Sequence, residues 1–372
     1  MWLSLVYCVG CFILAAFHTD LPLFQLGLFL IAMGAGGIKP CVSANVGDQF
    51  DESNQHLIGK AFSLFYFSIN FGSFFSTLLI PLVYRYWGPA WAFGIPGGLM
   101  FLATVIFFLG RHRYRRVPPK GVSKANFLSI NLHAATKGGW AAAADRFGEE
   151  RVSAVKAVWR ILALFAFTPV FWALLDQNSS EWVLQATKLD LHFAGVNWLP
   201  EQIQSLNPIL VLAFIPLFSF VVFPWLERRG MRLSPHRKIG WGFVLLVCAF
   251  VVIWLLQRAV DAGARPSVGW QAIAYVLLTA GEVLVYNTGL EFAYTQAPPS
   301  MKSTIMSFWL ITIALGNWIV SLINSSIAHG GWFARLTGAD YFLFFIVLMS
   351  VTTAIYFVRY RKERRGVVEV VG

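Results

Sequence analysis

Residues 21–43 read LPLFQLGLFLIAMGAGGIKPCVS, an apolar run of helix length that has a lysine near its end. A bilayer core takes about 20 apolar residues per helical crossing, so this stretch predicts a membrane-spanning helix. No acidic residue lies within one helical turn of Lys39. A cation in a membrane helix costs several kcal/mol unless it faces water or a counter-ion. The stretch therefore predicts a helix that lines a solute pathway through a membrane.

The composition of the 372-residue chain also indicates a membrane protein. Hydrophobic residues make up 57% and charged residues only 13%, whereas charged residues make up about 25% of an ordinary soluble domain. The apolar residues come in helix-length blocks at 1–17, 21–43, 60–84, 89–110, 156–176, 204–225, 238–257, 268–290, 303–327 and 340–359. We therefore predict an all-α, polytopic membrane protein with about ten transmembrane helices.

The net charge of +11 is concentrated in three basic segments, at 111–120, 227–238 and 359–365. Each segment follows an apolar block, which is the distribution that the positive-inside rule produces. Short basic segments beside membrane spans argue against nucleic-acid binding. They also predict that the C-terminus lies in the cytoplasm.

The longest connection between apolar blocks runs from 111 to 155 and separates four blocks from six. It is basic at its start and amphipathic toward its end, so we expect a cytoplasmic linker there. The remainder of an N-terminal bundle is then expected at 1–110, a C-terminal six-helix bundle at 156–360 and a cytoplasmic tail at 361–372. Because large transporters are commonly built from two halves of six helices, two helices are expected to precede Met1.

Polar residues interrupt the apolar blocks at four places. Each of these residues could have a purely structural role or a role in binding and transport. Lys39 could snorkel to the interface, Asn70 could join two helices by a hydrogen bond, and Asp176 could mark the outer interface. Glu282 lies about midway along its span, where so short a side chain cannot reach the interface. A buried carboxyl favours its neutral form. That property also suits a proton carrier or a partner for a peptide amine.

Five segments, in order along the chain, resemble the proton-dependent oligopeptide transporter family, the peptide-transporter branch of the major facilitator superfamily. They are GGIKPCVSANVGDQF (36–50), FSLFYFSINFGSF (62–74), FWALLDQNSSEWVLQA (171–186), SLNPIL (205–210) and LTAGEVLVYNTGLEFAYTQAPPSMKS (278–303). The resemblance implies a twelve-helix, alternating-access fold with a central cavity for di- and tripeptides. For this chain it implies the major facilitator fold without its first two helices.

The resemblance also implies roles for individual side chains. It assigns peptide binding to Lys39, Asn70, Trp172, Asn207, Glu282 and Trp309, and proton coupling or gating to Lys39, Asp176 and Glu282. These residue types suit the chemistry, because a zwitterionic peptide needs a cation, an acid and amides, while aromatic walls bury varied side chains. We expect no catalytic residue, no metal site and no cofactor. The proton gradient is the expected energy source.

The resemblance predicts proton-coupled symport of di- and tripeptides. One departure from the family's sequence pattern leaves other functions open. The Glu-x-x-Glu-Arg pattern of the family's first helix does not occur here. The chain could be a non-functional truncated remnant, or it could transport another small solute on the same fold. An intramembrane enzyme is disfavoured, since the sequence has no HExxH motif. The expected partners are peptide, protons and lipid, while the oligomeric state stays open. The short loop at 257–269 leaves no room for the extracellular domain of animal members, which predicts a bacterial inner membrane.

Overall fold

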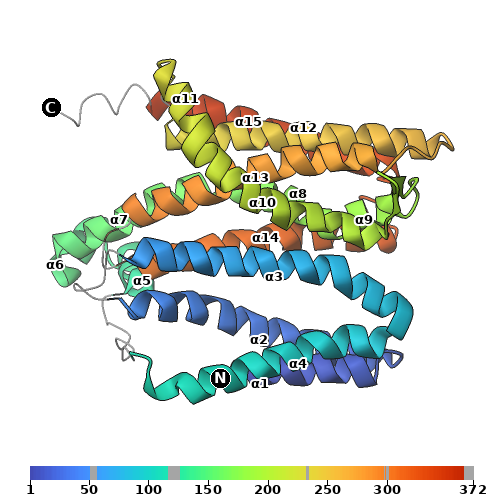
Figure 1. The fold of residues 1–372 in the computed structure, drawn as a ribbon. Coiled ribbons are helices and arrows are strands. Elements are labelled where there is room, and N and C mark those ends of the chain that lie inside the picture. The colour runs from blue at the N-terminus through green and yellow to red at the C-terminus, as the bar shows by residue number, and fades with distance from the viewer. Residues whose placement is uncertain (51–56, 116–125, 232–233, 297, 299–300, 364–372) are drawn as a thin grey trace. The chain divides into compact units, whose positions relative to one another are not determined.

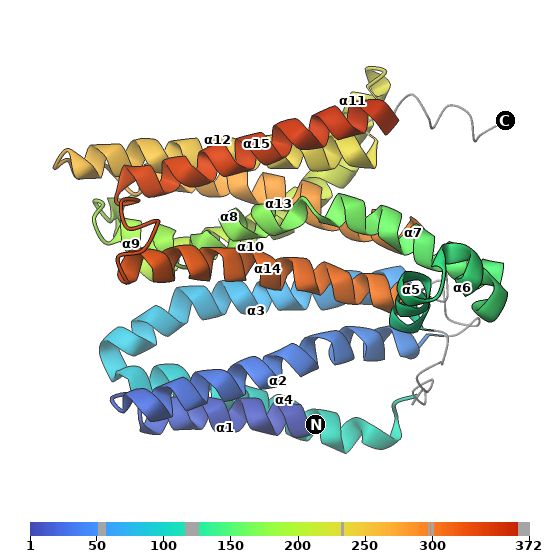
Figure 2. The ribbon, with the colours of Figure 1, turned by 180° about the vertical axis from the view of Figure 1, so that it is seen from behind.

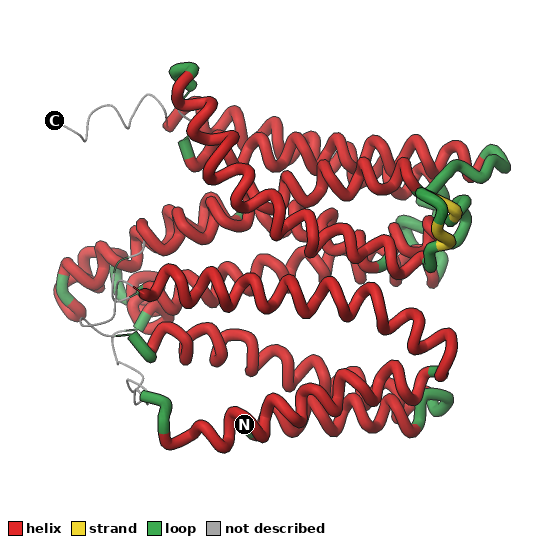
Figure 3. The backbone as a smooth tube through the Cα atoms, in the orientation of Figure 1, coloured by secondary structure: helices red, strands yellow, loops and turns green. Residues whose placement is uncertain are grey.

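The computed structural model describes residues 1–50, 57–115, 126–231, 234–296, 298 and 301–363 of the chain. Most of these residues are helical, and the two strands found among them, β1 (His192–Phe193) and β2 (Val196–Asn197), form a small antiparallel hairpin (Figure 3). The chain divides into two compact units, Met1–Lys120 and Gly121–Gly372.

The helices of the first unit are α1 (Trp2–Ala16), α2 (Leu21–Asp48), α3 (Ile58–Trp87) and α4 (Pro89–Leu109) (Figure 1). Helix α1 packs against both α2 and α4. A Cβ atom on Gly10 would lie 2.7 Å from the carbonyl oxygen of Gly27 on α2, so this crossing requires glycine. Large apolar side chains such as Phe29 and Leu99 are more than half exposed on these helices. That pattern is typical of helices surrounded by lipid.

The described α-helices of the second unit are α5 (Phe127–Thr136), α6 (Gly139–Phe147), α7 (Glu149–Phe165), α8 (Thr168–Leu175), α9 (Glu181–Ala186), α10 (Leu206–Pro216), α11 (Phe223–Arg228), α12 (Pro235–Asp261), α13 (Gly269–Gln296), α14 (Lys302–Ala328) and α15 (Ala339–Glu363). Short 3-10 helices at Asp176–Ser179 and Pro200–Ser205 and a π-helix at Leu217–Val222 connect some of them. Helices α12, α13 and α15 lie side by side in both Figure 1 and Figure 2, and α14 packs against α8. Fully buried aromatic residues, among them Phe243, Phe250 and Phe345, fill the core of this unit.

All ten apolar blocks predicted from the sequence are helical. Within the described residues, 8 helices are long and apolar enough to cross a membrane, and α7 with α8–α9 forms a further candidate span that is bent by 42°. Helix α1 is apolar but has only 15 residues. The prediction of an all-α, polytopic membrane protein is therefore confirmed.

The bend between α7 and α8 has a local cause. Pro169 follows the first residue of α8, where it lacks an N–H group to donate back into α7. The Oγ1 atom of Thr168 donates a 2.9 Å hydrogen bond to the carbonyl of Phe165, one of the acceptors that the break leaves open. The span predicted at 156–176 therefore consists of the end of α7 and all of α8.

The predicted linker and tail are partly described. Helices α5 and α6 and the start of α7 lie within 111–155, separated by Gly138 and Gly148 with φ of +103° and +89°. Residues 116–125 of the linker lie outside the described residues. The tail predicted at 361–372 begins in the last turn of α15, which ends at Glu363, and its residues 364–372 are also outside the described part.

The crossing of α12 and α13 predicts the effect of a single methyl group. A Cβ atom on Gly281 would lie 2.8 Å from the carbonyl oxygen of Gly242, and that oxygen cannot move without a shift of α12. We expect Gly281→Ala to lower stability by about 1–3 kcal/mol through overpacking. Thermal unfolding in detergent micelles measures this loss. The control is Gly98→Ala, because nothing lies within 4 Å of a Cβ atom there; equal melting temperatures for the two variants would contradict the prediction.

Candidate functional site

An amide from another helix holds the carboxyl group of Glu282. Glu282 lies on α13, and Asn207 lies in the first turn of α10. The Nδ2 atom of Asn207 donates a hydrogen bond of 2.7 Å to Oε2 of Glu282 and another of 3.1 Å to Oγ1 of Thr279. Thr279 and Glu282 are three residues apart on a helix and therefore share one face. The packing of α10 on α13 thus brings together two of the segments that the sequence singled out.

Tyr286, one helical turn from Glu282, belongs to a cluster of three aromatic rings. Tyr286 is four residues further along α13, and its ring centroid lies 6.0 Å from that of Trp172 on α8 and 6.0 Å from that of Trp309 on α14. The two tryptophan rings are 5.9 Å apart at an interplanar angle of 86°. Edge-to-face pairs of this kind contribute about 0.5–1.5 kcal/mol each beyond the area they bury. Three helices therefore meet in one aromatic cluster, which consists of Trp172, Tyr286 and Trp309.

The two tryptophans of this cluster carry unsatisfied donors. Trp172 and Trp309 are 4% and 1% exposed, and neither Nε1 atom has a hydrogen-bond acceptor among the described residues. A buried donor without an acceptor costs about 1–3 kcal/mol. A polar ligand that reached these rings would find two N–H groups ready to donate.

Asp176 is attached to α14 by a hydrogen bond. It begins the 3-10 turn Asp176–Ser179 after α8, and its Oδ2 atom accepts a 2.7 Å hydrogen bond from Nδ2 of Asn317. The neighbouring residue Gly316 permits this approach, since a Cβ atom there would lie 2.6 Å from the carbonyl oxygen of Pro169. The structure therefore places Asp176 where α8 and α14 meet at close range.

Lys39 and Asn70 belong to the first unit, whereas the other predicted site residues belong to the second. Lys39 is exposed on α2. Asn70 is only 9% exposed, and its Nδ2 atom donates a 3.0 Å hydrogen bond to the carbonyl of Tyr66 on the same helix. In the described part of the chain, this bond stays within α3 instead of joining α3 to another helix.

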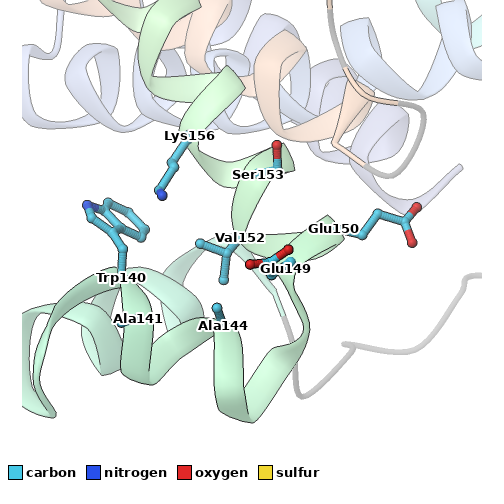
Figure 4. Close-up of a pocket in the computed structure, with 8 residues that line it drawn as sticks. All are labelled: Trp140, Ala141, Ala144, Glu149, Glu150, Val152, Ser153 and Lys156. Atoms are coloured by element: carbon cyan, nitrogen blue, oxygen red, sulfur yellow. The ribbon is translucent and has the colours of Figure 1, made fainter.

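A separate hollow of about 520 Å³ lies between α6 and α7 (Figure 4). Trp140 and Lys156 face each other across it, with the ammonium nitrogen 5.6 Å from the ring centroid. Its lining comes from one helical hairpin and includes none of the residues predicted to bind a solute. We therefore place the candidate site at Glu282 and the aromatic cluster rather than at this hollow.

The structure adds residues that the sequence analysis missed. Thr279 and Tyr286 lie three residues before and four residues after Glu282, so helical spacing alone could have indicated them. Asn317 had no such signal, because its contact with Asp176 joins residues far apart in the chain. Across the described residues, no group of three or more His, Cys, Asp or Glu side chains is placed to hold a metal ion.

Comparison with known proteins identifies the family. The sequence profile described as "POT family" matches residues 1–331. This chain belongs to the POT family. It is 38% identical over 314 residues to solute carrier family 15 member 2 of Mus musculus, which covers 78% of this chain and 42% of the relative. It is 37% identical over 291 residues to peptide transporter family 1 of Drosophila melanogaster, covering 71% of this chain and 39% of the relative. The chain thus spans less than half the length of these curated relatives.

Solved structures of the POT family share the fold. An auto-inhibited POT family peptide transporter is 36% identical, with a TM-score of 0.87 over 97% of this chain and 81% of that one. The POT family transporter PepTSo is 39% identical, with a TM-score of 0.86 over 97% of this chain and 83% of that one. The major facilitator fold and the family predicted from the sequence are therefore confirmed. The roles of the individual site residues stay predictions.

The contribution of the aromatic cluster to the stability of this POT family protein can be tested by substitution of Trp309. Trp309→Ala removes a ring that packs against Trp172 and Tyr286 of the cluster and against Phe165. It leaves a cavity, so we expect a loss of stability of about 3–5 kcal/mol. Trp309→Phe keeps a ring and removes the unsatisfied N–H group, so we expect a much smaller loss. Melting temperatures in detergent micelles distinguish the two variants. Trp318→Ala on the same helix serves as control, since Trp318 is 59% exposed; a comparable loss in Trp318→Ala would show that the cluster contributes nothing special.

Proposed function

We propose that this chain carries out proton-coupled symport of di- and tripeptides by alternating access. The observation that carries the proposal is an acid fixed within a membrane span by an amide, with Tyr286 of the aromatic cluster one helical turn away. A peptide's amine needs an acid, and its varied side chains need apolar aromatic surface. The names of two related proteins, which call them peptide transporters, support this substrate class.

In this proposal each site residue has one task. Glu282 binds the amino terminus of the peptide and Lys39 binds its carboxylate, while Asn70 and Asn207 contact polar groups. Trp172 and Trp309 enclose the side chains. Lys39, Asp176 and Glu282 carry out coupling and gating.

Coupling follows from the cost of charge in a span. A carboxylate removed from water must be neutralised by a proton or paired with a cation. At Glu282 a proton and a peptide ammonium can each meet that need, so binding of one affects binding of the other. The proton gradient supplies the energy, and no cofactor is required.

We also propose that the protein lies in a bacterial inner membrane with its C-terminus in the cytoplasm. The orientation rests on the basic residues that follow apolar helices, such as 111–115 after α4 and Arg359 near the end of α15. The proposal of a bacterial source rests on the short connection between α12 and α13, which covers only residues 262–268. So short a connection leaves no room for the extracellular domain of animal members of the family.

Uptake by proteoliposomes tests the proposed function. The full-length gene product is reconstituted, an inward proton gradient is applied, and accumulation of a radiolabelled dipeptide is measured. We expect accumulation that a protonophore abolishes and that unlabelled tripeptides compete for. Absence of accumulation would refute the proposal. Uptake of a different small solute, for which tripeptides do not compete, would favour the second candidate, a transporter of another solute on the same fold.

Lys39 provides a specific test of the carboxylate assignment. We expect Lys39→Ala to abolish proton-driven dipeptide uptake, because the peptide carboxylate would enter the site without a cation to neutralise it. The control is Lys137→Ala, which removes an exposed lysine just after α5, outside the candidate spans. Normal uptake by Lys39→Ala, with equal amounts of protein in the vesicles, would show that the assignment is wrong.

A further inference from the structure

The two N–H groups of the Asn207 side chain are both occupied. One is donated to Oε2 of Glu282 at 2.7 Å and the other to Oγ1 of Thr279 at 3.1 Å. The carbonyl oxygen Oδ1 accepts no hydrogen bond from the described residues. It also does not belong to the buried polar atoms that lack a partner. The amide therefore presents its oxygen, and not its nitrogen, to the accessible side.

The two partners of Asn207 make different contributions to this orientation. A carboxylate can only accept, so the opposite orientation would bring two acceptor oxygens together at about the same distance. Thr279 is fully buried on α13, and the helix backbone delivers its hydroxyl to a fixed place. A single hydrogen bond to Glu282 would let the amide swing about that contact, whereas a second bond from the same nitrogen fixes the plane of the amide.

We infer that Thr279 is a positioning residue that fixes Asn207 so that its carbonyl oxygen faces the substrate. Because Oε1 of Glu282 accepts no hydrogen bond from the described residues either, two acceptors then stand side by side. The ligand group that matches them is a primary ammonium, which offers several N–H donors and a positive charge. A carbonyl or carboxylate would meet only acceptors there. The inference deepens the proposed function and rests on it for the identity of the substrate.

The test compares binding of two probes, dialanine and N-acetyl-dialanine, to the purified full-length protein by microscale thermophoresis. Acetylation removes the charge and leaves one N–H donor, so wild-type protein should prefer dialanine. Thr279→Val keeps the shape of the side chain but not its hydroxyl. We expect this variant to bind dialanine about tenfold more weakly, which is the effect of losing one hydrogen bond to a polar group. Binding of the acetylated probe should change little.

Two further variants separate positioning from a general structural effect. Thr279→Ser restores the hydroxyl and should restore the preference for dialanine. Thr288→Val makes the same change at another buried threonine of α13, which is 7% exposed, and should leave the preference unchanged. Thr279→Ala replaces Thr279→Val if the valine variant elutes as an aggregate on size exclusion.

Each outcome decides between the claims. An equal preference for dialanine in wild type and in Thr279→Val, or in Thr279→Ala where it replaces the valine variant, would overturn the inference. A wild type that binds both probes alike would overturn it too. Loss of the preference in Thr279→Val with rescue by Thr279→Ser supports it. Failure of the wild type to accumulate dipeptide in vesicles, with its binding preference intact, would count against the proposed function alone.

Discussion

The second unit depends on one constraint, namely that an acidic side chain within a membrane span must find its partner inside the protein. An unsatisfied polar group in hydrocarbon costs several kcal/mol. Three acids of this unit meet the constraint in the same way, since each accepts a hydrogen bond from an asparagine on another helix. Asn207 donates to Glu282 at 2.7 Å, Asn317 to Asp176 at 2.7 Å and Asn324 to Glu181 at 3.1 Å. A neutral amide donor favours the ionised carboxyl less strongly than the full positive charge of a lysine or arginine partner would.

These hydrogen bonds require helices that approach closely. Lipid tails are as apolar as the helix surfaces, so the hydrophobic effect does not favour helix association within the membrane. Close packing at small residues stabilises the association instead. Gly281 precedes Glu282, and it faces Gly242 on α12 at a distance that excludes a Cβ atom. Gly316 precedes Asn317, and it lies equally close to the backbone of α8. At Gly316 the glycine permits the same helix contact that its polar neighbour Asn317 uses. Gly281 instead brings α13 close to α12, while its neighbour Glu282 bonds to Asn207 on α10.

The sequence predicts the helices well because a membrane span is a local property. Length and apolar content alone locate all ten blocks, whereas neither predicts the bend within the block at 156–176. The site is predicted less completely. Glu282 stands out as an acid in apolar surroundings, and Asn207 is indicated by the family resemblance. Their hydrogen bond, however, joins positions that are 75 residues apart. Such a contact depends on how α10 and α13 cross, and no periodicity within either helix encodes that crossing. For the same reason the sequence could not show that Asp176 is paired with Asn317.

Two of the three acid–amide bonds act on the same pair of segments. Asn317 and Asn324 lie seven residues apart on α14, which is about two helical turns, so they share one face of that helix. Their acceptors, Asp176 and Glu181, flank the turn between α8 and α9. The chain bends by 42° between α7 and the α8–α9 segment, so α8 does not continue α7 as one straight helix. The two hydrogen bonds attach this bent segment to α14. A hydrogen bond to a charged group contributes about 1.5–3 kcal/mol and one between neutral groups about 0.5–1.5 kcal/mol. The strength of this attachment therefore depends on the charge of two carboxyl groups, and protonation of either one would loosen α14 without breaking its packing at Gly316.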